Sequence, residues 1–152
     1  MAQTSIVDEF MKKLQEAERT GDVKDLVTLF SEGAECTALT RHNVHAKNEG
    51  QPQSPTQFWR QYLKAFDSIQ SKFNNVIDNG RFAVLEWHST GCLPMGLPID
   101  YNGVSILEYD ADNVHKFRTY YDSAALLPYA ARAEKTHSQT VGNPEINATA
   151  SS

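Results

Sequence analysis

The strongest strand pattern in the sequence runs from Arg81 to Asp122 and reads RFAVLEWHSTG (81–91), CLPMGLPIDYNGVSILEYD (92–110) and ADNVHKFRTYYD (111–122). Val, Ile, Leu and aromatic residues dominate each segment, and these residue types favour strands. Gly, Pro, Asn and Asp gather at 79–80, 91–98 and 110–113, where tight turns require them. The pattern predicts a meander of long antiparallel strands.

Upstream, helical and strand patterns alternate before this meander begins. Gly21 ends the first helical pattern, and Ser54, Pro55 and Gln57 form a strong start signal for a later helix. The predicted elements are, in order, helix 4–20, helix 22–30, strand 34–40, helix 55–66 and strand 69–78.

Helices that precede a run of strands are typical of the α+β class. We therefore expect a cone-shaped, curved antiparallel β-sheet closed by three N-terminal helices. The domain is expected to span residues 1–131, and the polar residues 132–152 to form a mobile C-terminal tail.

Composition excludes several classes of protein. The chain of 152 residues has a formal net charge of −5 and no basic stripe, which argues against nucleic-acid binding. No apolar run approaches the roughly 18 residues of a membrane span, and the N-terminus lacks the pattern of a signal peptide. The two cysteines, Cys36 and Cys92, have no CxxC spacing. These features predict a cytoplasmic protein.

The segments LEW (85–87), GVSILEYD (103–110) and FRTYYD (117–122), in this order of elements, resemble the NTF2-like superfamily and, within it, the SnoaL-like group. The resemblance covers about residues 5–125. It implies the NTF2-like α+β barrel and, in many members, a homodimer. The superfamily includes polyketide cyclases, ketosteroid isomerases, limonene epoxide hydrolases, scytalone dehydratase and non-catalytic transport factors, so the fold alone gives no reaction.

Catalytic positions carry over from this resemblance only in part. Against the limonene epoxide hydrolases, Glu86 occupies the place of the first aspartate, but Val84 and Thr119 replace the arginine and the second aspartate. Against the ketosteroid isomerases, the base position falls near Ala38, and the oxyanion-binding acid position falls on Ser105. Neither mechanism is implied in its original form.

Glu86 and His88 are the predicted catalytic pair. They share one face of their strand with Phe82 and Val84, and the resemblance directs that face into the cone. Their Cα atoms, two residues apart, lie roughly 6.5–7 Å from one another, close enough to share a water or a substrate proton. In the alternative interpretation Glu86 is a structural carboxylate and His88 lies at the wet rim of the pocket.

The predicted substrate-binding residues are Ser105, Thr119 and Tyr121 on the last two strands and Trp59 and Tyr62 on the helix above them. Ser105 and Tyr121 are expected to donate hydrogen bonds to a developing oxyanion. The alternative is that these polar groups satisfy one another in a mixed core, and that the aromatic residues are plain core.

Two functions follow from these residues. The first is a cofactor-free and metal-free acid–base enzyme acting on a small apolar molecule: an isomerase, cyclase, dehydratase (lyase) or hydrolase. The second is a non-catalytic ligand-binding or assembly module with the same fold. His42 and His45 make a weak metal site, and the polar segment 41–53 is a possible lid.

Assembly as a homodimer is predicted from the apolar content of both faces of the strands. One domain has helices enough to cover only one face of such a sheet. The face expected at the interface carries Leu85, Trp87, Val104, Ile106 and Tyr120.

Overall fold

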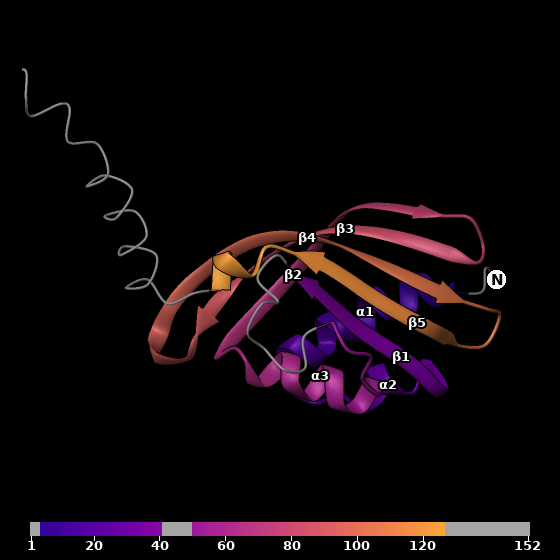
Figure 1. The fold of residues 1–152 in the computed structure, drawn as a ribbon, viewed down its shortest axis with the longest axis horizontal. Helices are drawn as coiled ribbons and strands as arrows, with labels where there is room; N and C mark the ends of the chain where they lie inside the picture. The colour runs from indigo at the N-terminus through magenta and orange to yellow at the C-terminus, as the bar shows by residue number, and fades with distance from the viewer. Residues whose placement is uncertain (1–3, 41–49, 127–152) are drawn as a thin grey trace, which may run out of the picture.

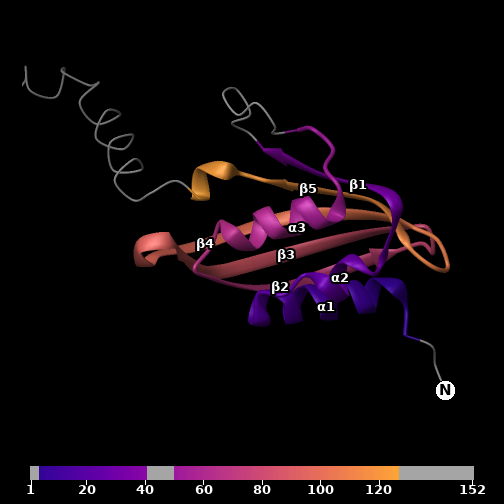
Figure 2. The ribbon, with the colours of Figure 1, turned by 90° about the horizontal axis from the view of Figure 1, so that it is seen from below.

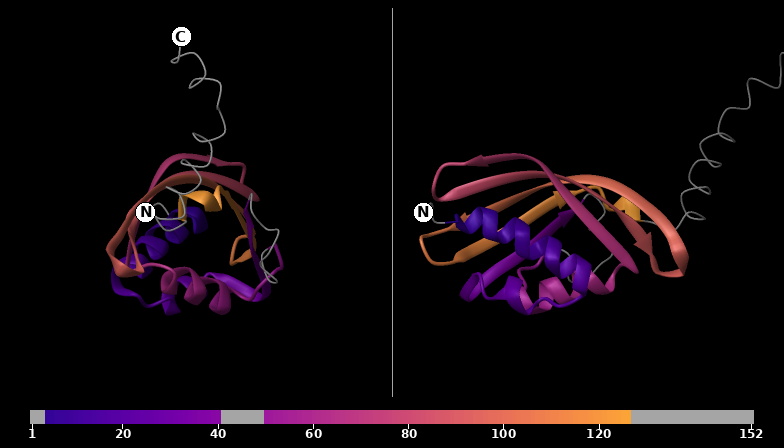
Figure 3. Two further views of the ribbon diagram at one scale, coloured as in Figure 1. Left: turned by 60° about the vertical axis from the view of Figure 1, so that its left-hand side comes forward. Right: turned by 180° about the vertical axis from the view of Figure 1, so that it is seen from behind.

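Five strands form one curved sheet, and helices α1, α2 and α3 lie against its concave side (Figures 1 and 3). A computed structural model describes residues 4–40 and 50–126, so the tail 132–152 and the pair His42 and His45 lie outside the described residues. The elements are α1 (Ile6–Thr20), α2 (Lys24–Val27), β1 (Phe30–Thr40), α3 (Pro55–Lys64), β2 (Ser68–Asp78), β3 (Phe82–Leu93), η1 (Pro94–Gly96), β4 (Leu97–Tyr109), β5 (Val114–Tyr121) and η2 (Ser123–Leu126). The predicted α+β class is confirmed.

The strand order is β1-β5-β4-β3-β2, so β1 and β2 form the two edges of an open sheet. The four strands β2 to β5 pair antiparallel, as the meander predicts. β1 instead pairs parallel to β5. The sheet curves over the helices, which gives the cone its shape (Figure 3).

The first strand differs from its prediction in length. β1 begins at Phe30, four residues before the predicted start at Ala34, and its register on β5 shifts between Phe30 and Glu35. Gly33 lies in this irregular part with φ at +80°, a conformation that favours glycine. The irregularity interrupts the alternating pattern from which a strand is predicted.

Local signals set the starts of α1 and α3 as predicted, whereas α2 is shorter than the predicted helix 22–30, whose last residue belongs to β1. The Ser5 hydroxyl accepts the Asp8 N–H at 3.0 Å, and Gly21 ends α1 in the left-handed conformation. The Ser54 hydroxyl accepts the Gln57 N–H at 3.3 Å, and Pro55 is the first residue of α3. In Figure 2 both helices run along the concave side of the sheet.

The face of β3 that points inward is the opposite of the predicted one. Ala83, Leu85 and Trp87 are buried, whereas Glu86 is exposed. Leu93 pairs with Leu97 across the tight connection η1, and from there each odd-numbered residue of β3 lies opposite an odd-numbered residue of β4. That register puts Leu85 on the same face as Ser105, which is inside the cone.

Aromatic rings make up much of the core between the sheet and the helices. The Trp59 ring lies 5.9 Å from Phe10, 4.9 Å from Phe58 and 5.0 Å from Phe117, measured between ring centroids. Rings at these separations in tilted or edge-to-face arrangements stabilise a core beyond their buried area. Among the described helices, none is long and apolar enough to cross a membrane.

Candidate functional site

A cavity of about 370 Å³ lies between the sheet and the helices. This volume falls in the range of small-molecule binding sites. None of the described residues that line it carries a formal charge. They are Phe10, Leu14, Ala38, Gly50, Gln51, Gln53, Phe58, Trp59, Gln61, Tyr62, Ala65, Phe66, Ser71, Phe73, Trp87, Ser89, Tyr101, Ser105, Phe117, Thr119, Tyr121 and Leu126.

One set of polar groups in the wall is a chain of hydrogen bonds across the strands. The Trp87 Nε1–H donates to the Ser105 hydroxyl at 2.9 Å, and Ser105 donates to Thr119 at 2.9 Å. Thr119 then donates to the backbone carbonyl of Val104 at 3.5 Å. Ser105 and Thr119 are both buried, so this chain satisfies polar groups that have little access to water.

A second set of polar groups joins the cavity to a carboxylate. The Tyr62 hydroxyl donates to Glu18 Oε2 at 2.7 Å, and the Ser71 hydroxyl donates to the same oxygen at 2.6 Å. The Ser71 N–H donates to Glu18 Oε1 at 3.0 Å, and the hydroxyls of Ser71 and Ser89 lie 2.6 Å apart. Tyr62, Ser71 and Ser89 line the cavity, and Glu18 lies behind them.

Two tyrosines of the cavity are held in the neutral form. Burial, followed by the negative charge of Glu18, raises the pKa of Tyr62 well above its ordinary value. Burial also raises the pKa of Tyr101, and the neighbouring Tyr121 and Glu18 add to the effect. Both hydroxyls therefore keep their protons at neutral pH.

The predicted substrate-binding residues lie together as their faces suggested. Ser105, Thr119 and Tyr121 line the cavity from the sheet, and Trp59 and Tyr62 line it from α3. Their contact with a substrate stays a prediction. The indole N–H of Trp59 is buried without a hydrogen-bond partner within the described chain.

Glu86 and His88 do not line the cavity, so their predicted place is wrong. Glu86 is exposed on the convex face of the sheet, where it accepts a hydrogen bond from Asn75 Nδ2 at 2.7 Å. His88 Nε2 lies 2.5 Å from Asp100 Oδ1, and 36% of its side chain is exposed. The interpretation of Glu86 as a satisfied carboxylate outside the pocket fits this geometry.

Glu18, Ser71 and Ser89 were missed, although the sequence contains a signal for the first. Phe10, Leu14 and Glu18 are spaced four residues apart, which places a carboxylate on the apolar face of α1. A carboxylate on a core-facing stripe has to find hydrogen-bond donors. The two serines carry no comparable local signal.

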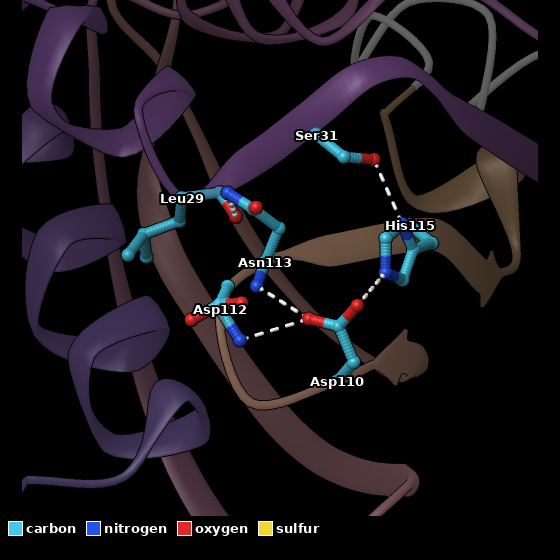
Figure 4. A network of polar contacts seen from close by, with 6 residues as sticks. All are labelled: Leu29, Ser31, Asp110, Asp112, Asn113 and His115. Atoms are coloured by element: carbon cyan, nitrogen blue, oxygen red, sulfur yellow. Dashed lines mark hydrogen bonds and ion pairs between the residues drawn. The ribbon is translucent and has the colours of Figure 1, made fainter.

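A further polar cluster fastens the β4–β5 turn to β1 (Figure 4). The Asp110 carboxylate accepts the N–H groups of Asp112 and Asn113, each at 2.8 Å. His115 Nε2 lies 2.5 Å from Asp110 Oδ2, and His115 Nδ1 lies 2.8 Å from the Ser31 hydroxyl. Ser, His and Asp meet here on an exposed edge, where they hold three segments together.

We expect the stabilising effect of Asp110 to disappear in acid. The hydrogen bond from His115 and the N–H groups of Asn113 and Asp112 lower the pKa of Asp110 to about 2. A carboxylate whose folded pKa is depressed stabilises the protein above its unfolded pKa of about 3.9, and this contribution is lost as the pH falls through the folded value. Thermal melting should show Asp110→Asn below the wild type at pH 6, with the two converging near pH 2.

Asp112→Asn is the matched control, because Asp112 contributes only its backbone N–H to this cluster. Its melting temperature should follow the wild type at both pH values. Equal melting of Asp110→Asn and wild type at pH 6 would contradict the stabilising role of the cluster.

The convex face of the sheet is where a dimer interface is predicted. Val104, Ile106 and Tyr120 lie there, and Tyr120 is 41% exposed. Leu85 and Trp87, which were expected with them, point into the core instead. The homodimer itself stays a prediction.

The SnoaL-like domain family model matches residues 11–117 of the sequence. No curated protein sequence matches significantly.

Within the described residues no group of three or more His, Cys, Asp or Glu side chains is placed to hold a metal ion.

Solved structures with this fold share little sequence with the chain. An NTF2-like protein from Anabaena variabilis superposes with a TM-score of 0.65 at 15% identity, covering 80% of this chain and 93% of that one. IdmH, a candidate polyketide cyclase from Streptomyces antibioticus, gives 0.64 at 16% identity, covering 81% and 96%. TerC, co-crystallised with polyporic acid, gives 0.66 at 11% identity, covering 80% and 95%. At these identities the likeness shows the fold alone.

Proposed function

Because this chain belongs to the SnoaL-like domain family, we propose that it binds a small, neutral, largely apolar molecule in the cavity and transforms it by acid–base chemistry. The observation that carries the proposal is a ring-lined cavity with no formal charge among its described lining residues and with a carboxylate directly behind one wall. A charged ligand would lose its hydration there without gaining an opposite charge.

In this proposal the aromatic rings hold the body of the ligand, and the polar groups orient it. Trp59, Tyr121 and the pair Ser105 and Thr119 form the predicted binding surface. The names of two structural neighbours, a candidate polyketide cyclase and a protein co-crystallised with polyporic acid, support an organic ligand of this size. The class of reaction, whether isomerisation, cyclisation, dehydration or hydrolysis, follows from the substrate.

Tyr62 and Glu18 are the proposed acid–base pair. Tyr62 lines the cavity and its hydroxyl lies 2.7 Å from Glu18 Oε2. When the Tyr62 oxygen takes a proton from the ligand, its own proton can pass to the carboxylate, and the reverse transfer returns a proton to the product. A general acid–base group typically contributes about 10²–10⁴-fold to a rate.

A second function is favoured by the same wall. No carboxylate, imidazole, amine or thiol is found among the described residues that line the cavity. A binding module with this fold needs none. The two functions are distinguished by whether the protein converts its ligand. A molecule captured from cell extract is identified by mass spectrometry and incubated with fresh protein. A new product indicates an enzyme, and an unchanged ligand indicates a binding module.

Filling the cavity is expected to abolish ligand binding. Ala38 lines the cavity from β1, and Ala38→Phe puts a ring into the space that the ligand would occupy. Equilibrium dialysis with naphthalene should show retention by the wild type and at least roughly tenfold weaker retention by the variant, because a buried ligand needs most of its surface covered.

Val104→Phe is the matched control, since Val104 lies on the convex face of the sheet opposite Glu86. Its retention of naphthalene should equal that of the wild type. A negatively charged analogue, naphthalene-2-sulfonate, should be retained by neither protein. If Ala38→Phe folds and still retains naphthalene fully, ligands bind elsewhere and the proposed function fails.

A further inference from the structure

We propose that the cavity selects ligands with a hydroxyl group that donates a hydrogen bond, and that Glu18 sets this preference through Tyr62. The preference rests on the function proposed above and defines its ligand class, a molecule with a hydroxyl group. It follows from counting the protons of the hydroxyl groups around Glu18.

The Glu18 carboxylate accepts hydrogen bonds from two hydroxyl groups. An ionised carboxylate accepts hydrogen bonds but donates none, and a hydroxyl has a single proton. Tyr62 and Ser71 both donate to Glu18 Oε2, at 2.7 Å and 2.6 Å. Neither hydroxyl therefore has a proton left for a ligand, and each offers only its lone pairs.

The donation from Ser71 to Glu18 also fixes the direction of the hydrogen bond between Ser71 and Ser89. The hydroxyls of Ser71 and Ser89 lie 2.6 Å apart, and Ser71 has already donated its proton to Glu18. Ser89 must then be the donor of that bond. Ser71 is 4% exposed and Ser89 is 1% exposed, whereas Tyr62 is only half-buried, so the Tyr62 oxygen is the accessible acceptor of this cluster.

The hydroxyl groups on the sheet, those of Ser105 and Thr119, also donate their protons to acceptors within the protein. Ser105 accepts from the Trp87 indole and donates to Thr119, and Thr119 donates to a backbone carbonyl. Ser105 therefore has no proton left for a ligand carbonyl. This revises the predicted role of Ser105 as a donor to an oxyanion.

Glu18 is the end point of the hydrogen bonds on this side of the wall. Its carboxylate accepts from the Tyr62 and Ser71 hydroxyls and from the Ser71 N–H. Glu18 also lines an outer hollow together with Arg19, Arg60, Lys64 and Asp67. The hydrogen bonds of the inner wall therefore run toward a residue that reaches the outer surface.

The two kinds of ligand oxygen meet this wall differently. A ligand hydroxyl donates to Tyr62 Oη and completes the chain that ends at Glu18. A ketone or ether oxygen in the same place brings its lone pairs against those of Tyr62 Oη. It loses its hydrogen bonds to water without gaining one from Tyr62. Sites that hydrogen-bond a hydroxyl reject analogues lacking it far more strongly than apolar pockets reject a changed methylene.

The test compares 2-naphthol with 2-methoxynaphthalene by equilibrium dialysis against the purified full chain. The two probes share a ring system, but only the first has a proton to donate. We expect the wild type to bind 2-naphthol roughly tenfold more tightly, the ratio that one hydrogen bond supports.

Glu18→Gln should bind the two probes with equal affinity, and both should still bind in the cavity. The Ser71 N–H, which lies 3.0 Å from Glu18 Oε1, keeps the amide oxygen on its own side, so the new NH₂ group faces the two hydroxyls. Those hydroxyls then accept, and their protons turn toward the cavity. Tyr62→Phe, which deletes the acceptor but keeps the Ser71 contacts, should also abolish the ratio.

Glu16→Gln is the control on the exposed side of the same helix, where Glu16 pairs with Arg19, and it should keep the wild-type ratio. Binding of both probes with equal affinity by the wild type overturns the hydroxyl preference but leaves the proposed function standing. Binding of neither probe overturns both. An unchanged ratio in Glu18→Gln and Tyr62→Phe also overturns the role of this pair.

Discussion

The Gly103→Ala variant is expected to melt at a lower temperature than the wild type and to lose the cavity's affinity for naphthalene. A Cβ atom on Gly103 would lie 2.2 Å from Cζ2 and 2.8 Å from Cε2 of the Trp87 ring. The ring cannot turn freely, because it packs 5.2 Å from Tyr101 and donates its N–H to Ser105. Overpacking of this kind costs about 1–3 kcal/mol.

Displacing Trp87 also breaks the hydrogen bond to Ser105, a contribution of about 1 kcal/mol. For a domain of this size each kcal/mol corresponds to roughly 2–4 °C in melting temperature. Thermal melting and dialysis measure the two effects. Combining Gly103→Ala with Trp87→Phe should recover part of the stability, because the smaller ring leaves room for the methyl group.

Asn102→Ala is the control for this variant, since Asn102 is exposed on the convex face of the same strand. It should change neither melting nor binding. A Gly103→Ala protein that melts and binds like the wild type would show that Trp87 is not fixed where it closes the cavity wall.

Local signals account for the parts of the fold that the sequence predicts correctly. The caps at Ser5 and Ser54 depend on a few neighbouring residues, and the structure has both helices starting there. Alternation on β5 likewise puts Thr119 and Tyr121 on one face, and the family resemblance directs that face and Ser105 on β4 toward the cavity, which they line. The caps and the alternation are each determined within a short segment.

The inward face of β3 depends on a non-local feature. Alternation divides Glu86 and His88 from Leu85 and Trp87 but does not say which pair points inward. The register is determined by the connection η1, where Met95 and Gly96 both adopt positive φ. The bulk of Leu85 and Trp87 was the better guide, because a buried face needs large apolar side chains more than a matching carboxylate.

The Glu18 cluster could not be assembled from spacing alone. Its members come from four different elements, with Glu18 on α1, Tyr62 on α3, Ser71 on β2 and Ser89 on β3. The helical pattern places Glu18 on the core side of α1 but says nothing about its partners. Only the packing of both helices on the sheet brings a carboxylate to the cavity wall.

The second large effect is expected from Leu85→Ala, which tests the inward face of β3 directly. Leu85 is completely buried, and replacing a buried leucine by alanine costs about 2–5 kcal/mol through lost contacts and the space left behind. Denaturant unfolding should show this loss, with naphthalene still bound, because Leu85 is not among the residues that line the cavity.

The neighbouring Glu86→Ala is the matched control. Its side chain is exposed and, among the described residues, makes one side-chain hydrogen bond, to Asn75, so the expected loss is within about 0.5–1 kcal/mol. Glu86→Gln should leave turnover of the true substrate unchanged, in contrast to Glu18→Gln. A large loss of stability or activity on changing Glu86, together with a small effect of Leu85→Ala, would show that the opposite face of β3 points inward and that Glu86 lies in the cavity.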